Sequence, residues 1–343
     1  MSTPSSSPAA VLPRGLARLA LTAATVAVAA VSLACTRATA QPSSPSNLAP
    51  TASTVRNAPM SADAAPAPFT VRVMGTGRPV LLIPGLMSGP DVWDATVAHL
   101  QRGHTLHIVH LAGFAGAPAA PGADFLGRVR DGLLAYVADM RARGLERPVV
   151  VGHSLGGFLA YAVASAQPDA VAGVVAVDGL PFFAALGDPA ATPESVGPTA
   201  AAMRGMFARL SPEQLAAQTR PGLPTLMRDS ASVARGVEWA RTSDPATVGQ
   251  AMAEMLTTDL RPAVAAIRAP VLQIVAAGSA PTAEVRAMLR DRYAAQVALV
   301  PRHEVIVAER AYHFVMLDDP AFFHATLDAF LSRVPTPAAR GQR

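Results

Sequence analysis

Short apolar runs and segments of helical periodicity alternate between residues 69 and 334. Six apolar runs predict strands, at residues 80–83, 106–109, 148–151, 171–177, 270–276 and 305–308. Amphipathic segments predict helices between and after them, at residues 91–101, 125–143, 155–166, 282–294 and 321–332. A run that is apolar at every position is typical of a strand buried on both faces. We therefore expect an α/β fold, in which a mostly parallel sheet carries helices on both faces.

A long segment from about residue 180 to 258 interrupts this alternation. It favours helix and is rich in phenylalanine and methionine. We interpret it as a helical cap insertion over one end of the sheet. Its apolar side chains either form the core of the insertion itself or contact a substrate. The candidates for substrate contact are Phe182, Phe183, Met206 and Phe207.

The first 40 residues resemble an export signal. Arg14 and Arg18 precede a run of small and apolar residues from 19 to 34, which is short for a membrane span. Cleavage is expected after Ala40, which ends a small-x-small triplet. Two alternatives are acylation of Cys35, which would associate the protein with a membrane, and an uncleaved anchor. All three predict a periplasmic or secreted protein.

The two ends flank the expected folded domain. Residues 41–68 are rich in serine, proline and alanine without hydrophobic periodicity, which predicts a disordered spacer. Residues 336–343 form a similar polar tail. The α/β domain is therefore expected to span residues 69–335.

Composition and charge exclude several classes of protein. Of 343 residues, 51% are hydrophobic and 15% are charged, which excludes a wholly disordered chain. The net charge is +4, but without the first 40 residues 25 arginines face 24 acidic residues, and no aromatic-interleaved basic cluster remains. Nucleic acid is therefore not an expected partner. The chain has no lysine, which excludes a Schiff base, and its single cysteine excludes an internal disulfide.

The motif Gly152-His153-Ser154-Leu155-Gly156 lies between a predicted strand and a predicted helix. A serine at such a sharp turn is exposed at the helix N-terminus, and its neighbours must be small because strand and helix nearly collide. This context predicts that Ser154 is a nucleophile. His153, inside the motif, is expected to pack rather than to catalyse.

The domain resembles an α/β-hydrolase across essentially residues 69–334. The resemblance rests on residues 83–86 (IPGL), on the motif at 152–156 and on residues 312–320 (YHFVMLDDP). In this family the chain order is nucleophile, acid, histidine. The resemblance implies that His313, between the last predicted strand and the last helix, is the base that takes the serine proton.

The pattern offers two candidates for the acid. Family members usually carry it after the strand that here ends near Val275, but residues 276–280 (AAGSA) contain no carboxylate. Some members place it after the preceding strand, where this chain has Asp178. Asp178 is the preferred candidate and Glu284 the reserve. The expected oxyanion-hole donors are the backbone N–H groups of Leu155 and of Leu86, with Met87 as an alternative to Leu86.

These residues predict an exported serine hydrolase that cleaves carboxylic esters of small or medium apolar substrates through an acyl-serine intermediate. No cofactor is expected, because water would resolve the acyl-serine intermediate. No metal is expected either, because the histidines at 104, 107 and 110 alternate faces on a strand. An epoxide hydrolase or dehalogenase would carry aspartate in place of Ser154. Two alternatives remain open. One is a catalytically silent binding protein, and the other is an acyltransferase, lactonase or amidase using the same triad.

Overall fold

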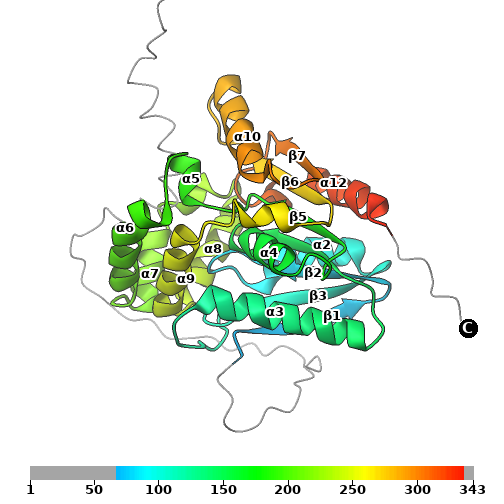
Figure 1. Cartoon of the computed structure of the whole chain (residues 1–343). Coiled ribbons are helices and arrows are strands. Elements are labelled where there is room, and N and C mark those ends of the chain that lie inside the picture. Colours follow the sequence, from blue (N-terminus) through cyan, green and yellow to red (C-terminus); the bar gives the residue numbers. More distant parts are fainter. Residues whose placement is uncertain (1–66, 336–343) are drawn as a thin grey trace, which may run out of the picture.

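One seven-stranded sheet forms the centre of the domain, in the order β1-β3-β2-β4-β5-β6-β7 (Figure 1). The computed structural model describes residues 67–335. The strands are β1 (Phe69–Gly75), β2 (Arg78–Ile83), β3 (His104–Leu111), β4 (Val149–His153), β5 (Gly173–Val177), β6 (Val271–Ala276) and β7 (His303–Ala308). All neighbouring pairs are parallel except β1 and β3, so the expected mostly parallel sheet is confirmed.

The strand β1 was missed by the apolar-run criterion. It lies at the edge of the sheet, pairs with β3 only and is partly exposed on both faces. An edge strand needs no continuous apolar run, because solvent can reach its side chains. The central strands β4 and β5, by contrast, are buried at every position.

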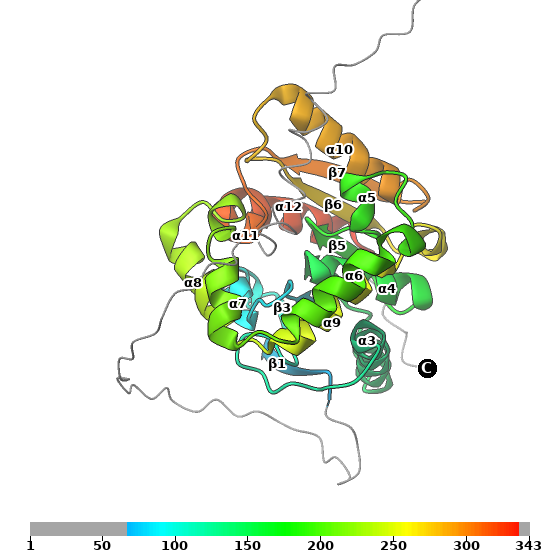
Figure 2. The same ribbon diagram turned by 90° about the vertical axis from the view of Figure 1, so that its left-hand side faces the viewer.

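Helices cover both faces of the sheet, as expected (Figure 2). On one face, side chains of α2 (Asp94–Leu100) and α12 (Pro320–Arg333) share a core with alternate strand residues such as Leu82 and Val151. On the other face, α3 (Phe125–Ala142) and α4 (Leu155–Ala166) pack on the intervening residues, such as Leu81 and Val150. The same face carries α10 (Ala283–Val297), which packs against Val275.

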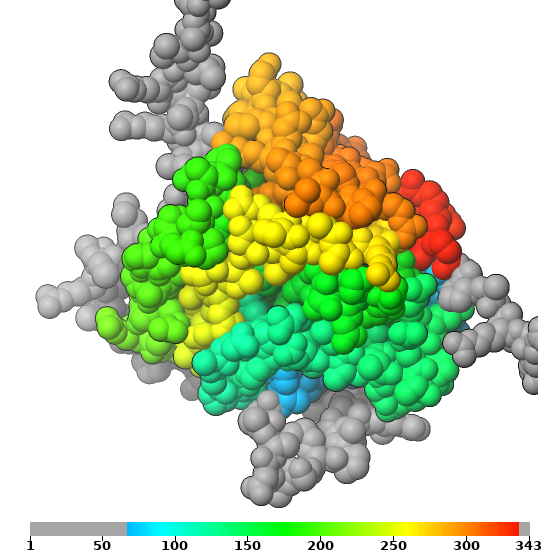
Figure 3. Space-filling model, viewed as in Figure 1, coloured from blue at the N-terminus to red at the C-terminus, as the bar shows by residue number. Residues whose placement is uncertain are grey.

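The chain segment that connects β5 to β6 forms a set of helices at one end of the molecule (Figures 1 and 3). It comprises α5 (Ala184–Gly187), α6 (Pro193–Phe207), α7 (Pro212–Thr219), η2 (Leu223–Thr225), α8 (Ser230–Arg241), α9 (Pro245–Thr257) and η3 (Ala263–Ala266). The N-termini of α6, α7, α8 and α9 are capped by the side chains of Thr192, Ser211, Asp229 and Asp244. Such caps satisfy backbone amides that a helix leaves free and fix where each helix begins.

Two short helical segments complete the domain, η1 (Pro90–Trp93) before α2 and α11 (Val315–Asp318) before α12. Among the described residues, no helix is long and apolar enough to cross a membrane. The predicted signal segment with Cys35 and Ala40, the spacer up to residue 66 and the tail from residue 336 lie outside the described residues.

Candidate active site

Ser154 occupies a sharp turn between β4 and α4. Its backbone has φ 53° and ψ −115°, a combination that L-residues rarely adopt. The two flanking glycines make the turn possible. A Cβ on Gly152 would overlap the carbonyl oxygen of Gly156, and a Cβ on Gly156 would overlap that of Ile83. The fold thus holds a strained serine at the end of β4 and the beginning of α4.

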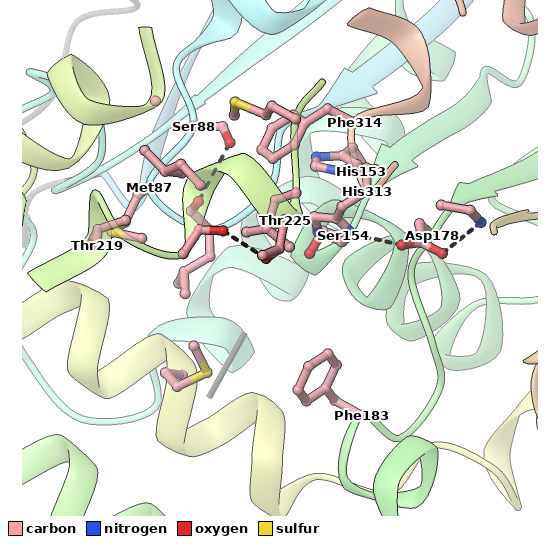
Figure 4. A pocket seen from close by; sticks show the side chains of 18 of the residues that line it. Met87, Ser88, His153, Ser154, Asp178, Phe183, Thr219, Thr225, His313 and Phe314 are labelled. Carbon is pink, nitrogen blue, oxygen red and sulfur yellow. Dashed lines mark hydrogen bonds and ion pairs between the residues drawn. The ribbon is translucent and has the colours of Figure 1, made fainter. Parts of the chain in front are cut away.

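His313 and Asp178 form a close pair beside Ser154 (Figure 4). The His313 Nδ1 lies 2.6 Å from the Asp178 Oδ2. A carboxylate only accepts hydrogen bonds, so Nδ1 donates, and in the neutral imidazole Nε2 is then the acceptor. The reserve acid Glu284 lies elsewhere, exposed on the first turn of α10. The structure therefore places Asp178, and not Glu284, beside His313.

The second oxygen of Asp178 is also bonded. Oδ1 accepts hydrogen bonds from the Ala276 N–H at 2.9 Å and from the Tyr293 hydroxyl at 2.8 Å. Asp178 itself has a left-handed backbone with φ 49°. Asparagine, aspartate and glycine tolerate this conformation best. The carboxylate is thus fixed at both oxygens, and Oδ2 faces His313.

His153 packs behind His313 and is fully buried. Its Nε2 lies 3.0 Å from the carbonyl oxygen of His313. A carbonyl only accepts, so Nε2 carries the proton. Burial holds the pKa of His153 well below its usual value, and the charge of a protonated His313 lowers it further. His153 therefore stays neutral and fixes the backbone that carries His313.

Ser154 and His313 line one cavity and lie next to each other in Figure 4. No hydrogen bond joins the Ser154 hydroxyl to the His313 ring within residues 67–335. Such catalytic hydrogen bonds often shorten only when a substrate is bound. Asp178, His313 and Ser154 thus follow one another in the spatial order that an acid, a base and a nucleophile would need.

The cavity has a volume of about 190 Å³ and lies between the sheet and the inserted helices. Of the described residues, Asp178 is the one formally charged side chain in its wall. The rest is mostly apolar. The insertion contributes Phe183, Leu186, Phe207, Leu223, Leu226, Met227, Trp239, Met252 and Met255.

The structure separates the four residues that were expected to contact a substrate. Phe183 and Phe207 line the cavity, whereas Phe182 and Met206 do not. Phe182 is fully buried in a separate cluster, where its ring packs beneath the Arg261 guanidinium at 4.7 Å. Met206, next to Phe207 in α6, is partly buried and packs against the main hydrophobic core.

The predicted oxyanion donors lie where they can serve the cavity. Leu155 is the first residue of α4 and follows Ser154 directly. Leu86 and Met87 line the cavity wall in the turn after β2, where Met87 has φ 60°. In the described part of the chain, the amides of these three residues donate to no protein group. The choice between Leu86 and Met87 stays a prediction.

Comparison with known proteins identifies the fold and the family. The sequence model of the alpha/beta hydrolase family matches residues 80–326, well over half of the chain. The chain belongs to the alpha/beta hydrolase family.

Individual relatives agree with this assignment. A pimeloyl-[acyl-carrier protein] methyl ester esterase of Klebsiella pneumoniae is 27% identical over 264 residues, covering 74% of this chain and 94% of the relative. The corresponding esterase of Sodalis glossinidius is 31% identical over 58% of this chain and 75% of the relative. A thermophilic esterase from Thermogutta terrifontis has the same fold, with a TM-score of 0.64 at 20% identity over 78% of this chain and 94% of that one.

The loop that carries His313 in this alpha/beta hydrolase is tied to the insertion. The Asp318 carboxylate accepts hydrogen bonds from the backbone N–H of Tyr312 at 2.7 Å and of Arg228 at 3.0 Å. Burial raises the pKa of Asp318. The Phe314 N–H also donates to the carbonyl of Leu226, which lines the cavity. The His313 loop and one wall of the cavity are therefore held by the same contacts.

Residues that could bind a metal ion do not gather in this site. No group of three or more histidine, cysteine, aspartate or glutamate side chains is placed for metal binding within residues 67–335. The buried His107, on β3, instead pairs through Nδ1 with the Tyr136 hydroxyl at 2.7 Å, away from the cavity.

Proposed function

We propose that this protein is an exported serine hydrolase that cleaves carboxylic esters of small or medium apolar substrates. The observation that carries the proposal is the chain of contacts from Asp178 to His313 at the wall of an apolar cavity that Ser154 also lines. The esterase activity of the relatives from Klebsiella pneumoniae and Sodalis glossinidius supports the reaction class.

The first half of the proposed reaction acylates the enzyme. The Ser154 hydroxyl oxygen attacks the ester carbonyl while His313 Nε2 takes its proton. The Asp178 carboxylate stabilises the imidazolium that forms, and backbone N–H groups of Leu155 and of the Leu86–Met87 turn receive the oxyanion. The ester C–O bond then breaks, and the leaving alcohol takes the proton from His313.

The second half releases the acid. His313 Nε2 takes a proton from water as the water oxygen attacks the acyl-serine carbonyl. The bond to the Ser154 oxygen breaks, and the proton returns to that oxygen. The products are one alcohol and one carboxylic acid, so the balanced reaction needs no cofactor.

The wall of the cavity supports an uncharged substrate. A substrate carboxylate placed there would lose its hydration, and no arginine lines the cavity among the described residues. An ammonium group would meet only the Asp178 carboxylate, which is already bonded at both oxygens. Phe183, Phe207 and the methionines of α9 offer contact to an acyl or alkyl chain instead.

Labelling and hydrolysis test the proposal together. A fluorophosphonate probe is expected to label wild-type protein at Ser154, and p-nitrophenyl acetate or butyrate is expected to be hydrolysed. Both signals should vanish in Ser154→Ala. Ser165→Ala is the matched control, because the Ser165 hydroxyl bonds within α4 and lies outside the cavity. A folded wild-type protein that neither reacts nor hydrolyses any ester, lactone or amide would leave only a binding role.

Export is the remaining part of the proposal. The basic and apolar segment before Ala40 supports it. N-terminal sequencing of protein recovered from outside the cytoplasm is expected to begin at Gln41. Recovery of a lipid-modified Cys35 would replace cleavage after Ala40 by membrane attachment.

A further inference from the structure

The acid of the triad is held by a residue that no motif of the family indicates. Asp178 Oδ1 accepts two hydrogen bonds, one from the backbone of Ala276 and one from the side chain of Tyr293. Of these, the hydroxyl of Tyr293 is the contact that a substitution can remove. Tyr293 comes from α10, more than a hundred residues beyond Asp178 in the chain.

The surroundings of Tyr293 make its hydroxyl a permanent donor. The side chain is 4% exposed and packs against Leu180 and Val275 at the edge of the cavity. Burial, and next the neighbouring Asp178 charge, raise the pKa of Tyr293 well above its usual value. The phenol therefore stays protonated at working pH. Because the Asp178 carboxylate can only accept, the hydroxyl proton points at Oδ1.

We propose that Tyr293 is a positioning residue that sets the basicity of His313 through Asp178. This inference rests on the proposed function, in which His313 is the general base. The hydroxyl occupies Oδ1, so that Oδ2 is presented to His313 Nδ1. It also withdraws part of the negative charge of the carboxylate, which would otherwise stabilise the imidazolium form of His313 more strongly.

The direction of the effect follows from the groups that face His313. Among the described residues, two titratable side chains contact its ring, Asp178 from the end of β5 and His153 from the end of β4. His153 is neutral because burial lowers its pKa. The negative charge on Asp178 is thus the neighbouring charge that favours the protonated form of His313 over the neutral form. Weakening a hydrogen bond to that charge raises the pKa of His313 and leaves less free base at a given pH.

The variant Tyr293→Phe tests the proposal, with p-nitrophenyl butyrate as substrate. We expect kcat/KM to fall about ten- to a hundredfold, by analogy with the groups that orient metal-binding histidines from behind. We also expect the acidic limb of the kcat/KM–pH profile to move to higher pH, by up to about one pH unit. A merely structural tyrosine would lower stability without moving this limb.

Tyr161→Phe is the matched control. Tyr161 is also fully buried, and its hydroxyl donates to the buried Gln273 at 2.7 Å rather than to the triad. Both variants are expected to unfold at lower temperature than the wild type, but Tyr161→Phe should keep the wild-type acidic limb. An unchanged limb in Tyr293→Phe, or an equal movement in Tyr161→Phe, would overturn the proposal.

Two further measurements keep the test decisive. The imidazole proton resonances of His313, assigned with His313→Gln, report its pKa without any turnover. These resonances test the role of Tyr293 even if the protein hydrolyses no ester. A lack of hydrolysis would count against the proposed function and not against the role of Tyr293. If Tyr293→Phe does not fold, 3-fluorotyrosine at position 293 retains the hydroxyl and makes it a stronger donor. The His313 pKa should then fall, and an unchanged or higher value would refute the role.

Discussion

The substitution Asp178→Asn separates the charge of the acid from its shape. The asparagine carbonyl oxygen can take the place of Oδ1 and accept from the Ala276 N–H and the Tyr293 hydroxyl. Its amide group then faces His313 Nδ1, where it can only donate. The reverse orientation would set the amide nitrogen against the Ala276 N–H. Leaving that buried donor unsatisfied costs about 1–3 kcal/mol.

The forced orientation selects the wrong tautomer of the base. His313 must accept at Nδ1 and carry its proton on Nε2, so it cannot take the proton of Ser154. The same change in a serine protease lowers kcat by about 10⁴, which corresponds to about 5 kcal/mol of transition-state stabilisation. We expect a loss of this size here, because the contact at 2.6 Å is the one charged partner of the His313 ring among the described residues.

Steady-state hydrolysis of p-nitrophenyl butyrate measures the loss, and thermal unfolding shows that the variant remains folded. Glu284→Gln is the matched control, since it makes the same acid-to-amide change at an exposed position on α10. It is expected to retain wild-type activity. The reasoning fails if folded Asp178→Asn keeps more than about a tenth of the wild-type rate, far above the loss that the wrong tautomer causes. It fails equally if Glu284→Gln carries the large loss.

Two other predictions concern the cavity and the core. Phe183→Ala should raise kcat/KM for longer acyl chains relative to acetate, because Phe183 lines the cavity. Phe182→Ala should leave the chain-length preference unchanged and lower the free energy of unfolding by about 3–5 kcal/mol. A p-nitrophenyl ester series and thermal unfolding of both variants check this. Burial lowers the pKa of His107 from 6.5 to about 4, so the unfolded chain binds more protons between these values and stability falls as pH drops through that window. His107→Gln should make the free energy of unfolding in urea less dependent on pH between 6.5 and 4, and an equal slope in both proteins would contradict it.

The buried strands and the turn at Ser154 were predictable because local sequence determines them. Continuous apolar runs mark strands covered on both faces, and glycines at 152 and 156 are required where β4 and α4 nearly touch. The edge strand β1 has no such signature, because every one of its side chains is exposed or only partly buried.

The acid and the cavity wall depend on tertiary contacts that local sequence does not specify. Asp178 and Glu284 were both open from the pattern, and the approach of the His313 loop to the end of β5 decides between them. Neighbouring residues of the insertion point in different directions, so the choice among its aromatic side chains needed the packing of α5 and α6. Tyr293 gave no signal, since a tyrosine within a helix is ordinarily a core residue.

The long chain separations within the site bear on how the protein folds. Asp178 and His313 are 135 residues apart, and His153 contacts the His313 backbone across 160 residues. Contacts of this range form after the intervening loops have closed, so they come late and slowly. A partly folded chain in which β7 and α12 have not docked would have the turn at Ser154 but no His313 beside it. Recovery of catalytic activity during refolding therefore reports completion of the whole domain, whereas recovery of secondary structure can precede it.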